Sequence, residues 1–512
     1  MALVGRKTIS SLIVGQETPE ERRHRKRAEK KRREDLKRRL KIERQEEAAR
    51  WKSEWPKWEP VKRDWAGSRV GVARFGQIRA TTRTLRTAYP FLAEAGLGNH
   101  GPFIGTDLLS GSGFTFDPWL LYQAQKLTNP NITVAGVIGT GKSALCKALV
   151  TRSQAWGRNA YIPGDVKGEW SPVARALGGV VIRLGRGFKA RLNPLDEGIR
   201  PARTAEGRPV DDGLWASMVR QARLSLLTAL VGAMLARPLR PEEHTALGAA
   251  LDGVCASTSV PLIGGVARQL LVPADMSRSV LPAGVRDVSQ LANMGWDAGN
   301  ALTRLVSGDL AGLFDGPSTV AFDTRAPIVS VDLSEFFQDT GALPLLMTCT
   351  AAWMESSLRD DQAPKRYVIY DEAHRLMKDA GLLHRMKEQW KLARAFGISN
   401  VLVLHRFSDL EAVGDEGSEA RGLARGLVTD TSTRIVFGQS ADQKEMVGQW
   451  LGLSTEVLDQ LPGMVSRRGQ AVWQVNDKPY FVQDILTRGE LELFDTDARM
   501  GEEDENVLPN HG

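Results

Sequence analysis

Cysteine is scarce in this sequence, with three residues among 512: Cys146, Cys255 and Cys349. They are too few and too scattered for a disulfide framework or a zinc cluster, so we expect a reducing compartment and no zinc. Long apolar runs are also missing, since uncharged stretches such as 224–236 and 340–354 fall short of the roughly 20 residues that a membrane-spanning helix needs. The N-terminal residues lack the apolar core of a signal peptide. We therefore expect a cytoplasmic protein.

The middle of the chain has almost no net charge, although the whole chain carries +7. Residues 1–90 sum to +14, residues 489–512 to −7, and residues 91–488 to zero. A uniformly basic nucleic-acid-binding domain is disfavoured, because its positive charge should lie on the folded part. We expect the charged ends to determine where the protein docks, and its chemical activity to depend on other residues.

The length and the shifts in composition predict two or three structural units. The basic arm includes residues 20–50, which carry 15 basic and 8 acidic side chains and almost no large apolar ones. A solvated or partly disordered helix is the favoured interpretation of this segment, and contact with DNA or an anionic lipid surface is the alternative. The predicted segments are a basic helical arm with a Trp-rich linker (1–65), a small β-rich lead-in (66–130), an α/β core (131–210 and 313–485), an all-α insertion (211–312) and an acidic tail (486–512).

From residue 131 onward, short apolar segments alternate with helical ones. This alternation is typical of a mostly parallel sheet with helices on both faces. The predicted strands are 132–135, 160–162, 180–184, 328–333, 366–370, 401–404 and 434–437.

A complete Walker A pattern, GVIGTGKS, occupies residues 136–143. An apolar strand precedes it and a helical segment follows it, which is the context that a phosphate-binding P-loop requires. Glycines let backbone N–H groups converge on phosphate oxygens, and the helix N-terminus adds the positive end of its dipole. Lys142 should reach the β- and γ-phosphates of ATP, and Ser143 should ligate Mg²⁺. The expected nucleotide contacts are Gly136, Gly139, Thr140, Gly141, Lys142 and Ser143.

The second half of a nucleotide site follows the apolar strand 367–370, which leads directly into Asp371 and Glu372. Ligands of open α/β sheets bind at the carboxyl ends of the strands. Asp371 therefore fits the Walker B role of holding Mg²⁺ and its water shell. Glu372 fits the role of orienting and activating the attacking water.

Three further polar residues are candidates because of their positions next to predicted strands. His405 follows the strand 401–404 and could touch the γ-phosphate or the lytic water as a sensor. Arg394, near the end of a helix predicted over 384–396, could reach the ATP of a neighbouring subunit in a ring. Arg434, which opens the last predicted strand, is a weaker candidate for a phosphate contact.

The sequence resembles the VirB/TraC/TrbE-type ATPases of conjugative type IV secretion systems, within the HerA–FtsK superfamily of ring-forming P-loop motors. Besides the Walker motifs, the stretch Asp165 to Glu169, followed by Asn193 and Pro194, is the more discriminating part of the resemblance. The segments that carry it are GVIGTGKS (136–143), GDVKGEW (164–170), LNPLD (192–196), VIYDEAH (368–374) and ARAFGISNVLVLHRFSDL (393–410).

The resemblance covers about residues 100–485 and implies a RecA-like core with a helical insertion. It also implies a hexameric or other oligomeric ring, ATP hydrolysis with Mg²⁺, and partners among the channel components at the inner face of the membrane. Two features depart from the family. The superfamily usually has Gln where this chain has His405, and family members commonly have a larger N-terminal domain than the first 130 residues supply.

Three functions are compatible with this pattern. The leading one is a secretion ATPase that powers assembly of, or transfer through, a membrane channel. The second is a DNA-translocating pump of the coupling-protein or HerA–FtsK type, which should line its pore with basic residues, whereas residues 91–488 sum to zero. The third is a nucleotide-gated scaffold with little hydrolysis, against which the presence of both Asp371 and Glu372 argues.

Overall fold

A computed structural model describes residues 96–495 except 205–206, 274–280, 309, 340, 360–362, 379, 393 and 406–417. The predicted basic arm, residues 66–95 of the predicted lead-in and the last residues of the predicted acidic tail lie outside the described part. The architecture below is that of residues 96–495.

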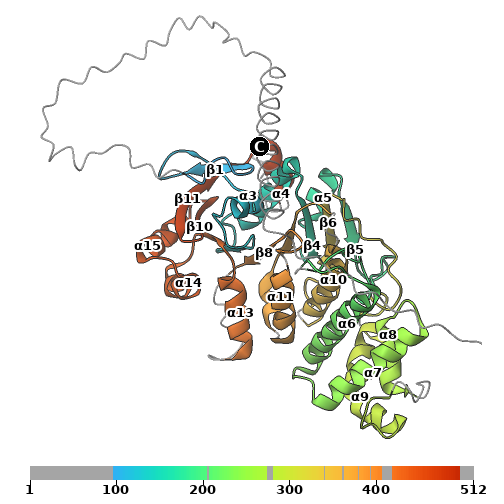
Figure 1. Ribbon diagram of the computed structural model, residues 1–512. Helices are drawn as coiled ribbons and strands as arrows, with labels where there is room; N and C mark the ends of the chain where they lie inside the picture. Colours follow the sequence, from blue (N-terminus) through green and yellow to red (C-terminus); the bar gives the residue numbers. More distant parts are fainter. Residues whose placement is uncertain are drawn as a thin grey trace, which may run out of the picture. The chain divides into compact units, whose positions relative to one another are not determined.

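An 11-stranded sheet organises this part of the chain (Figure 1). Its parallel part lies in the order β9-β3-β8-β7-β4-β6-β5, and each pair of neighbours there is parallel. Every strand predicted from the sequence forms. Their bounds are β3 (Ile132–Ala135), β4 (Asn159–Asp165), β5 (Val180–Arg183), β6 (Ile328–Asp332), β7 (Arg366–Tyr370), β8 (Ile398–Leu404) and β9 (Thr433–Phe437).

Four antiparallel strands extend the sheet beyond β9, in the order β10, β11, β1 and β2. Their bounds are β1 (Phe103–Asp107), β2 (Gly113–Thr115), β10 (Gln470–Val475) and β11 (Lys478–Asp484). The β-rich character expected of the lead-in is therefore present in β1 and β2, but these strands join the core sheet. The hairpin β10–β11 was not predicted, although its tight turn contains Asn476 at φ 51°, a conformation that Asn tolerates.

Helices cover both faces of the sheet, as the apolar strands require. One face packs against α3 (Pro118–Gln123), α4 (Lys142–Ser153), α5 (Ser171–Ala176) and α16 (Arg488–Phe494). The other packs against α6 (Asp212–Leu235), α10 (Leu343–Leu358), α11 (Ala380–Leu392), α13 (Glu419–Thr429), α14 (Lys444–Leu451) and α15 (Thr455–Met464). Short 3-10 helices lie at Gln154–Trp156, Ser334–Phe336, Ala373–Lys378 and Ala441–Gln443.

Alternate side chains of β7 show how one strand serves both faces. Tyr367 and Ile369 belong to the core on the α4 side, whereas Val368 and Tyr370 belong to the core on the α10 side. This alternation follows from the two-residue period of a strand. Because both faces are covered, the parallel strands are nearly continuous apolar runs.

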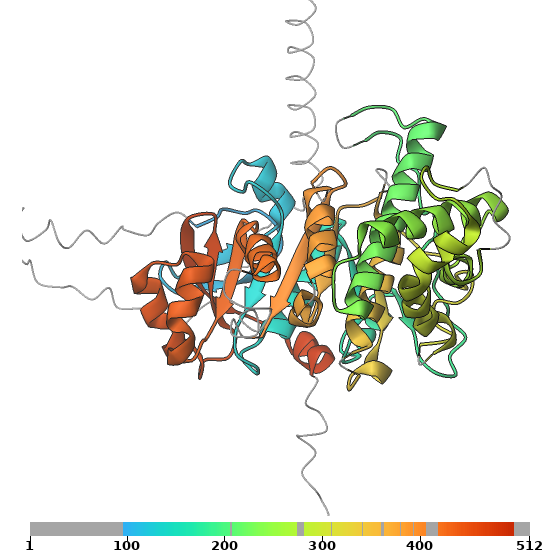
Figure 2. The same cartoon turned by 90° about the horizontal axis from the view of Figure 1, so that it is seen from below.

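Between β5 and β6 the chain forms a group of helices, α6, α7 (Pro241–Ser257), α8 (Ile263–Leu271) and α9 (Val288–Ser307), which pack on one another. They gather at the β5 end of the sheet, drawn green to yellow in Figure 2. Asp211 begins α6, since its side chain accepts a hydrogen bond from the Leu214 N–H. The RecA-like fold class with a helical insertion is thus the architecture observed.

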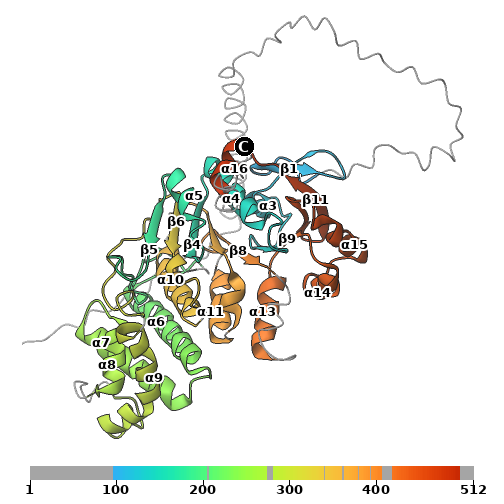
Figure 3. The same cartoon turned by 180° about the vertical axis from the view of Figure 1, so that it is seen from behind.

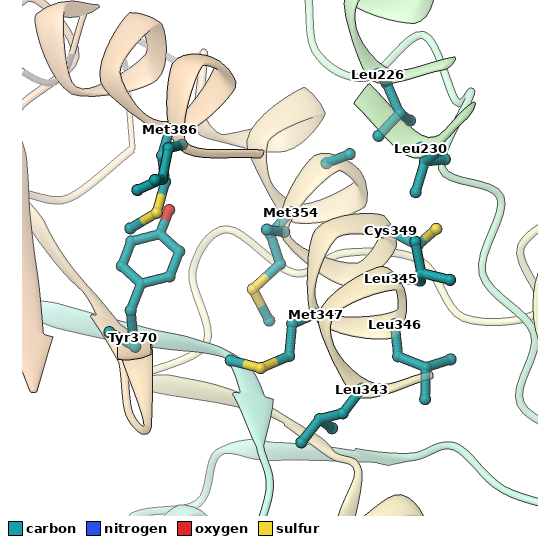
Figure 4. Close-up of a cluster of buried hydrophobic side chains, with 14 of the residues drawn as sticks. Leu226, Leu230, Leu343, Leu345, Leu346, Met347, Cys349, Met354, Tyr370 and Met386 are labelled. Carbon is teal, nitrogen blue, oxygen red and sulfur yellow. The ribbon is translucent and has the colours of Figure 1, made fainter. Parts of the chain in front are cut away.

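By length and composition alone, α6 could cross a membrane, and it is the one such helix within the described ranges. Part of its apolar surface is used inside the protein: Leu226 and Leu230 face α10, near Leu345 and Cys349 (Figure 4). Of its most apolar 18-residue window, 33% is buried, so packing against the core accounts for part of the apolar character of α6.

The start of the predicted acidic tail is folded rather than extended. Thr487 and Glu490 form a capping box that begins α16, and α16 lies beside α4 (Figure 3). Both carboxylate oxygens of Glu490 accept hydrogen bonds from Arg152 of α4, each at 2.7 Å. The tail boundary at residue 486 is therefore corrected, because a bidentate ion pair and a cap attach residues 487–494 to the core.

Candidate nucleotide site

The segment 136–143 forms the loop between β3 and α4 and the first two residues of α4, at the carboxyl edge of the sheet. Gly139 and Gly141 have φ of 83° and 112°, values that only glycine adopts without strain. A Cβ atom on Gly136 would lie 2.5 Å from the Cβ of Phe437, so the loop approaches β9 too closely for a side chain there. The conformation of this loop thus requires glycine at the glycine positions of the predicted pattern.

The loop is braced from the side of the sheet that β9 and β10 form. The Val137 N–H donates to the Gly438 carbonyl at 3.2 Å, and the Gly469 N–H donates to the Thr140 carbonyl at 2.9 Å. The Thr140 hydroxyl donates to the Val137 carbonyl at 2.7 Å, which closes the loop on itself. Gly469 directly precedes the unpredicted strand β10, so that hairpin supports the phosphate loop.

The first turn of α4 presents backbone N–H groups without a side-chain cap, because its N-cap residue is Gly141. An uncapped helix N-terminus favours an anion. Ser143, the second residue of α4, is half-buried. The loop, the open helix end and the Ser143 hydroxyl form the donor set that a nucleotide phosphate with Mg²⁺ requires.

Lys142 is buried and turns back over the loop. Its Nζ donates to the carbonyls of Gly136 at 2.7 Å and Val137 at 2.9 Å. Burial lowers the pKa of Lys142 to about 8, although the carboxylates of Asp371 and Glu372 act in the opposite direction. A phosphate group would offer this ammonium a stronger partner than the two carbonyls.

Asp371 lies at the end of β7, on the same edge of the sheet as the phosphate loop. Tyr370 pairs with Leu402 of β8, and Ala135 pairs with Leu404 of the same strand, so both strands end at the same edge of the sheet, two residues apart in register. The Trp170 indole N–H donates to Asp371 Oδ2 at 3.1 Å. Burial raises the pKa of Asp371, and the neighbouring charge of Glu372 adds to this shift. Mg²⁺ would reverse that effect, since a cation favours an ionised carboxylate.

Glu372 is held in an unusual backbone conformation, with φ of 55°. A non-glycine residue in the left-handed region costs roughly 1–3 kcal/mol, and such residues cluster at functional sites. The Glu372 N–H donates to Asp371 Oδ1 at 3.1 Å, which maintains the turn. The two adjacent carboxylates therefore leave the strand in different directions.

The Glu372 carboxylate is heavily contacted. Its Oε1 lies 2.8 Å from His405 Nε2 and 2.6 Å from Lys167 Nζ. Burial raises the pKa of Glu372, but the hydrogen bond and charge of His405 and the ion pair with Lys167 outweigh it and lower the pKa to about 2. His405, predicted as a sensor of the γ-phosphate or the lytic water, thus lies in contact with the predicted catalytic carboxylate.

The loop that follows β4 contributes residues to the site for which no role was predicted. Besides Lys167 and Trp170, it carries Glu169, which pairs with Lys147 of α4 at 3.2 Å. Asp165 fixes the base of the loop, because its Oδ2 accepts the backbone N–H groups of Trp170 at 2.9 Å and Ser171 at 3.1 Å. The only signal in the sequence was the family resemblance of this stretch.

Asp165 is itself an unusual acid. Burial raises the pKa of this carboxyl to about 7, although the hydrogen bond from the Trp170 N–H acts against that shift. The nearby Asp332 adds to the increase, while Arg183 lies 3.1 Å from Asp332 and neutralises it. The loop base is therefore a buried polar cluster rather than a solvated turn.

Arg394 is not brought to this site within the chain. Helix α11 ends at Leu392, earlier than predicted, because a turn from the Arg394 carbonyl to the Gly397 N–H leads into β8. Arg394 is exposed at the amino end of β8, whereas His405 follows the carboxyl end. A strand rises about 3.3 Å per residue, so the seven residues of β8 separate them by roughly 20 Å.

The prediction of a phosphate contact for Arg434 is wrong. Its guanidinium donates to the carbonyls of Leu451 at 2.9 Å and Thr429 at 3.1 Å. Arg434 lies near the amino end of β9, opposite Thr133, while the phosphate loop lies beyond the carboxyl ends. A strand that runs parallel to β3 places only its last residues near the loop.

Fold and site together define the RecA-like P-loop class. Among solved structures, the chain is similar to VirB4 of Thermoanaerobacter pseudethanolicus, with a TM-score of 0.62 and 17% identity over 77% of this chain and 98% of that one. A bacterial conjugative coupling protein, TrwB without its first residues, matches with a TM-score of 0.45 and 15% identity over 70% of this chain and 85% of that one. No protein-family model matches the sequence. A search of curated proteins finds no match either.

The likeness to VirB4 establishes the fold. It confirms the architecture that the sequence resemblance implied, a RecA-like P-loop core of the type found in that protein.

Proposed function

We propose that this chain is an ATP-hydrolysing motor of a type IV secretion or conjugal transfer system, which powers assembly of, or transfer through, a membrane channel. The observation that carries the proposal is the convergence of Lys142, Asp371 and Glu372 at one edge of a sheet with the VirB4 fold. A phosphate loop without carboxylates would support binding alone. The pair of acids adds the groups that hydrolysis needs.

Each residue has a distinct part in this reaction. Lys142 binds the β- and γ-phosphates after leaving the Gly136 and Val137 carbonyls, and Ser143 and Asp371 would hold Mg²⁺. The ion, when bound, neutralises charge on the phosphates. Glu372 orients the attacking water and accepts its proton. His405, hydrogen-bonded to Glu372, positions that carboxylate and senses the γ-phosphate.

The motor acts as a ring in this proposal, in the cytoplasm at the inner face of the membrane, where the channel components are its partners. Arg394 then serves the ATP site of the neighbouring subunit, which agrees with its exposure and its distance from its own site.

Cross-complementation tests the role of Arg394. Arg394→Ala should lower turnover by about 10³-fold or more, since an arginine finger contributes that much. A Lys142→Ala chain has an impaired site but an intact Arg394, so mixing the two variants should restore part of the turnover measured by phosphate release. Full activity of Arg394→Ala alone, or no restoration in the mixture, would remove this residue from the mechanism.

The second candidate function is a DNA-translocating pump, which is distinguished by the effect of DNA on turnover. We expect steady-state ATPase activity of the full chain to be unchanged by single- or double-stranded DNA, because residues 91–488 carry no net positive charge. The measurement is repeated across a salt series to separate specific stimulation from charge effects. Strong stimulation by either form would favour the pump over the secretion motor.

A further inference from the structure

Lys167 occupies a position that hinders Glu372 from binding an attacking water. Its Nζ lies 2.6 Å from Glu372 Oε1, and His405 Nε2 contacts the same oxygen at 2.8 Å. An oxygen that already has two close donors is poorly placed to accept a hydrogen bond from an attacking water. The other carboxylate oxygen, Oε2, lies 3.6 Å from His374 Nδ1, so departure of one of the two donors from Oε1 gives the attacking water an unobstructed oxygen.

Lys167 is the donor that can leave. Its side chain is 38% exposed, against 13% for His405 and 7% for Glu372. It is long and flexible, and because its ammonium group already reaches solvent, water can hydrate it when the ion pair opens. His405, by contrast, is confined directly after the buried strand β8.

The backbone around Lys167 is fixed, so a movement would be confined to the side chain. Asp165 accepts two backbone N–H groups before α5, Glu169 pairs with Lys147, and Trp170 donates to Asp371. Gly168 has φ of 72°, which forms the turn directly after Lys167. The loop thus presents a mobile ammonium from a rigid base that touches both α4 and Asp371.

The charges around Lys167 give it a second partner when nucleotide binds. Lys142 of the phosphate loop is close enough for the Lys167 charge to contribute to lowering the pKa of Lys142. Glu372 orients the water that attacks the γ-phosphate, so an ammonium that reaches Glu372 also lies near that phosphate. A triphosphate brings strong acceptor oxygens to this point, whereas a diphosphate leaves it empty.

We propose that Lys167 distinguishes nucleoside triphosphate from diphosphate by exchanging partners: it holds Glu372 in the nucleotide-free chain and binds the terminal phosphate oxygen of a bound triphosphate. This inference rests on the proposed function. The exchange frees Glu372 to orient water only when a γ-phosphate is present. After loss of that phosphate, Lys167 returns to Glu372.

The test compares the affinity of the full chain for a non-hydrolysable ATP analogue and for ADP, both with Mg²⁺, measured by calorimetry. Lys167→Met should lower the affinity for the analogue by about 10-fold or more, which is the loss expected for one hydrogen bond to a charged group. The affinity for ADP should stay within about 2-fold of the wild-type value. Lys167→Arg should retain the preference because it keeps the charge and the donors. Lys365→Met, a substitution at the amino end of β7, should change neither affinity.

Glu372→Gln provides a second variant in case the loss of Lys167 perturbs folding. The amide removes the negative charge and leaves Lys167 at most a neutral hydrogen-bond acceptor, so Lys167 is held less tightly and binding of the analogue should tighten relative to ADP. Equal weakening of both nucleotides in Lys167→Met, or no change in either, would overturn the proposal. A wild-type chain that binds neither nucleotide would instead overturn the proposed function, and the inference with it.

Discussion

Replacing Lys142 with alanine should lower ATP turnover by about 10³-fold or more, because the variant loses the buried cation at the phosphate loop. Removing one preorganised electrostatic group from an active site typically costs 10²–10³-fold, and Lys142 supplies a full charge in a buried position. Steady-state phosphate release measures the effect. Nucleotide binding should weaken as well, since the ammonium contacts the phosphates in both the ground state and the transition state.

Lys365→Ala is the matched control for this variant. Lys365 directly precedes β7, whereas Asp371 follows the end of the same strand, so the two lie at opposite edges of the sheet. Turnover should stay at the wild-type level in the control. Undiminished turnover in a folded Lys142→Ala chain would exclude the loop 136–143 as the catalytic phosphate site.

Replacing Glu372 with glutamine should leave nucleotide binding in place and lower hydrolysis by about 10²–10⁴-fold, the usual contribution of a general base. The amide can still accept a hydrogen bond from His405, so the geometry is retained while the proton acceptor is lost. Quantifying bound nucleotide after incubation with Mg²⁺ and ATP checks this, since the variant should retain ATP rather than ADP.

Glu492→Gln is the control here, because Glu492 is exposed on α16 and pairs only with Arg488 among its described contacts. It should hydrolyse ATP normally. A Glu372→Gln chain that accumulates ADP at the wild-type rate would show that another group activates the water.

The strands and the two halves of the site could be predicted because their signals are local. Buried parallel strands are short apolar runs. The motif GVIGTGKS includes Gly139 and Gly141, whose positive φ values form the loop. Asp371 was predictable because it directly follows β7. The parallel order of the sheet then brings these segments to one edge without further information.

What could not be predicted depends on contacts between distant segments. Trp170 reaches Asp371 across 201 positions of sequence, and Lys167 reaches Glu372 from the loop that follows β4. No sequence pattern around either residue indicates which residue it contacts. The hairpin β10–β11 was missed although Asn476 marks its turn, and its contact from Gly469 to Thr140 is equally long-range.

Arg434 shows how a positional argument fails. The residue belongs to a core strand, as predicted, but it lies at the wrong end of that strand and donates to carbonyls of Thr429 and Leu451. The prediction already placed Arg434 at the first residue of the strand 434–437, and the start of a strand parallel to β3 lies at the edge of the sheet opposite the phosphate loop.

The central claim is that the groups around Lys142 and Glu372 hydrolyse ATP, and wild-type turnover tests it most directly. Steady-state phosphate release by the full chain, with Mg²⁺ and again with a chelator, is the measurement. We predict turnover that requires Mg²⁺. A folded chain that binds ATP with Mg²⁺ but releases no phosphate would contradict the claim and leave a nucleotide-gated scaffold in its place.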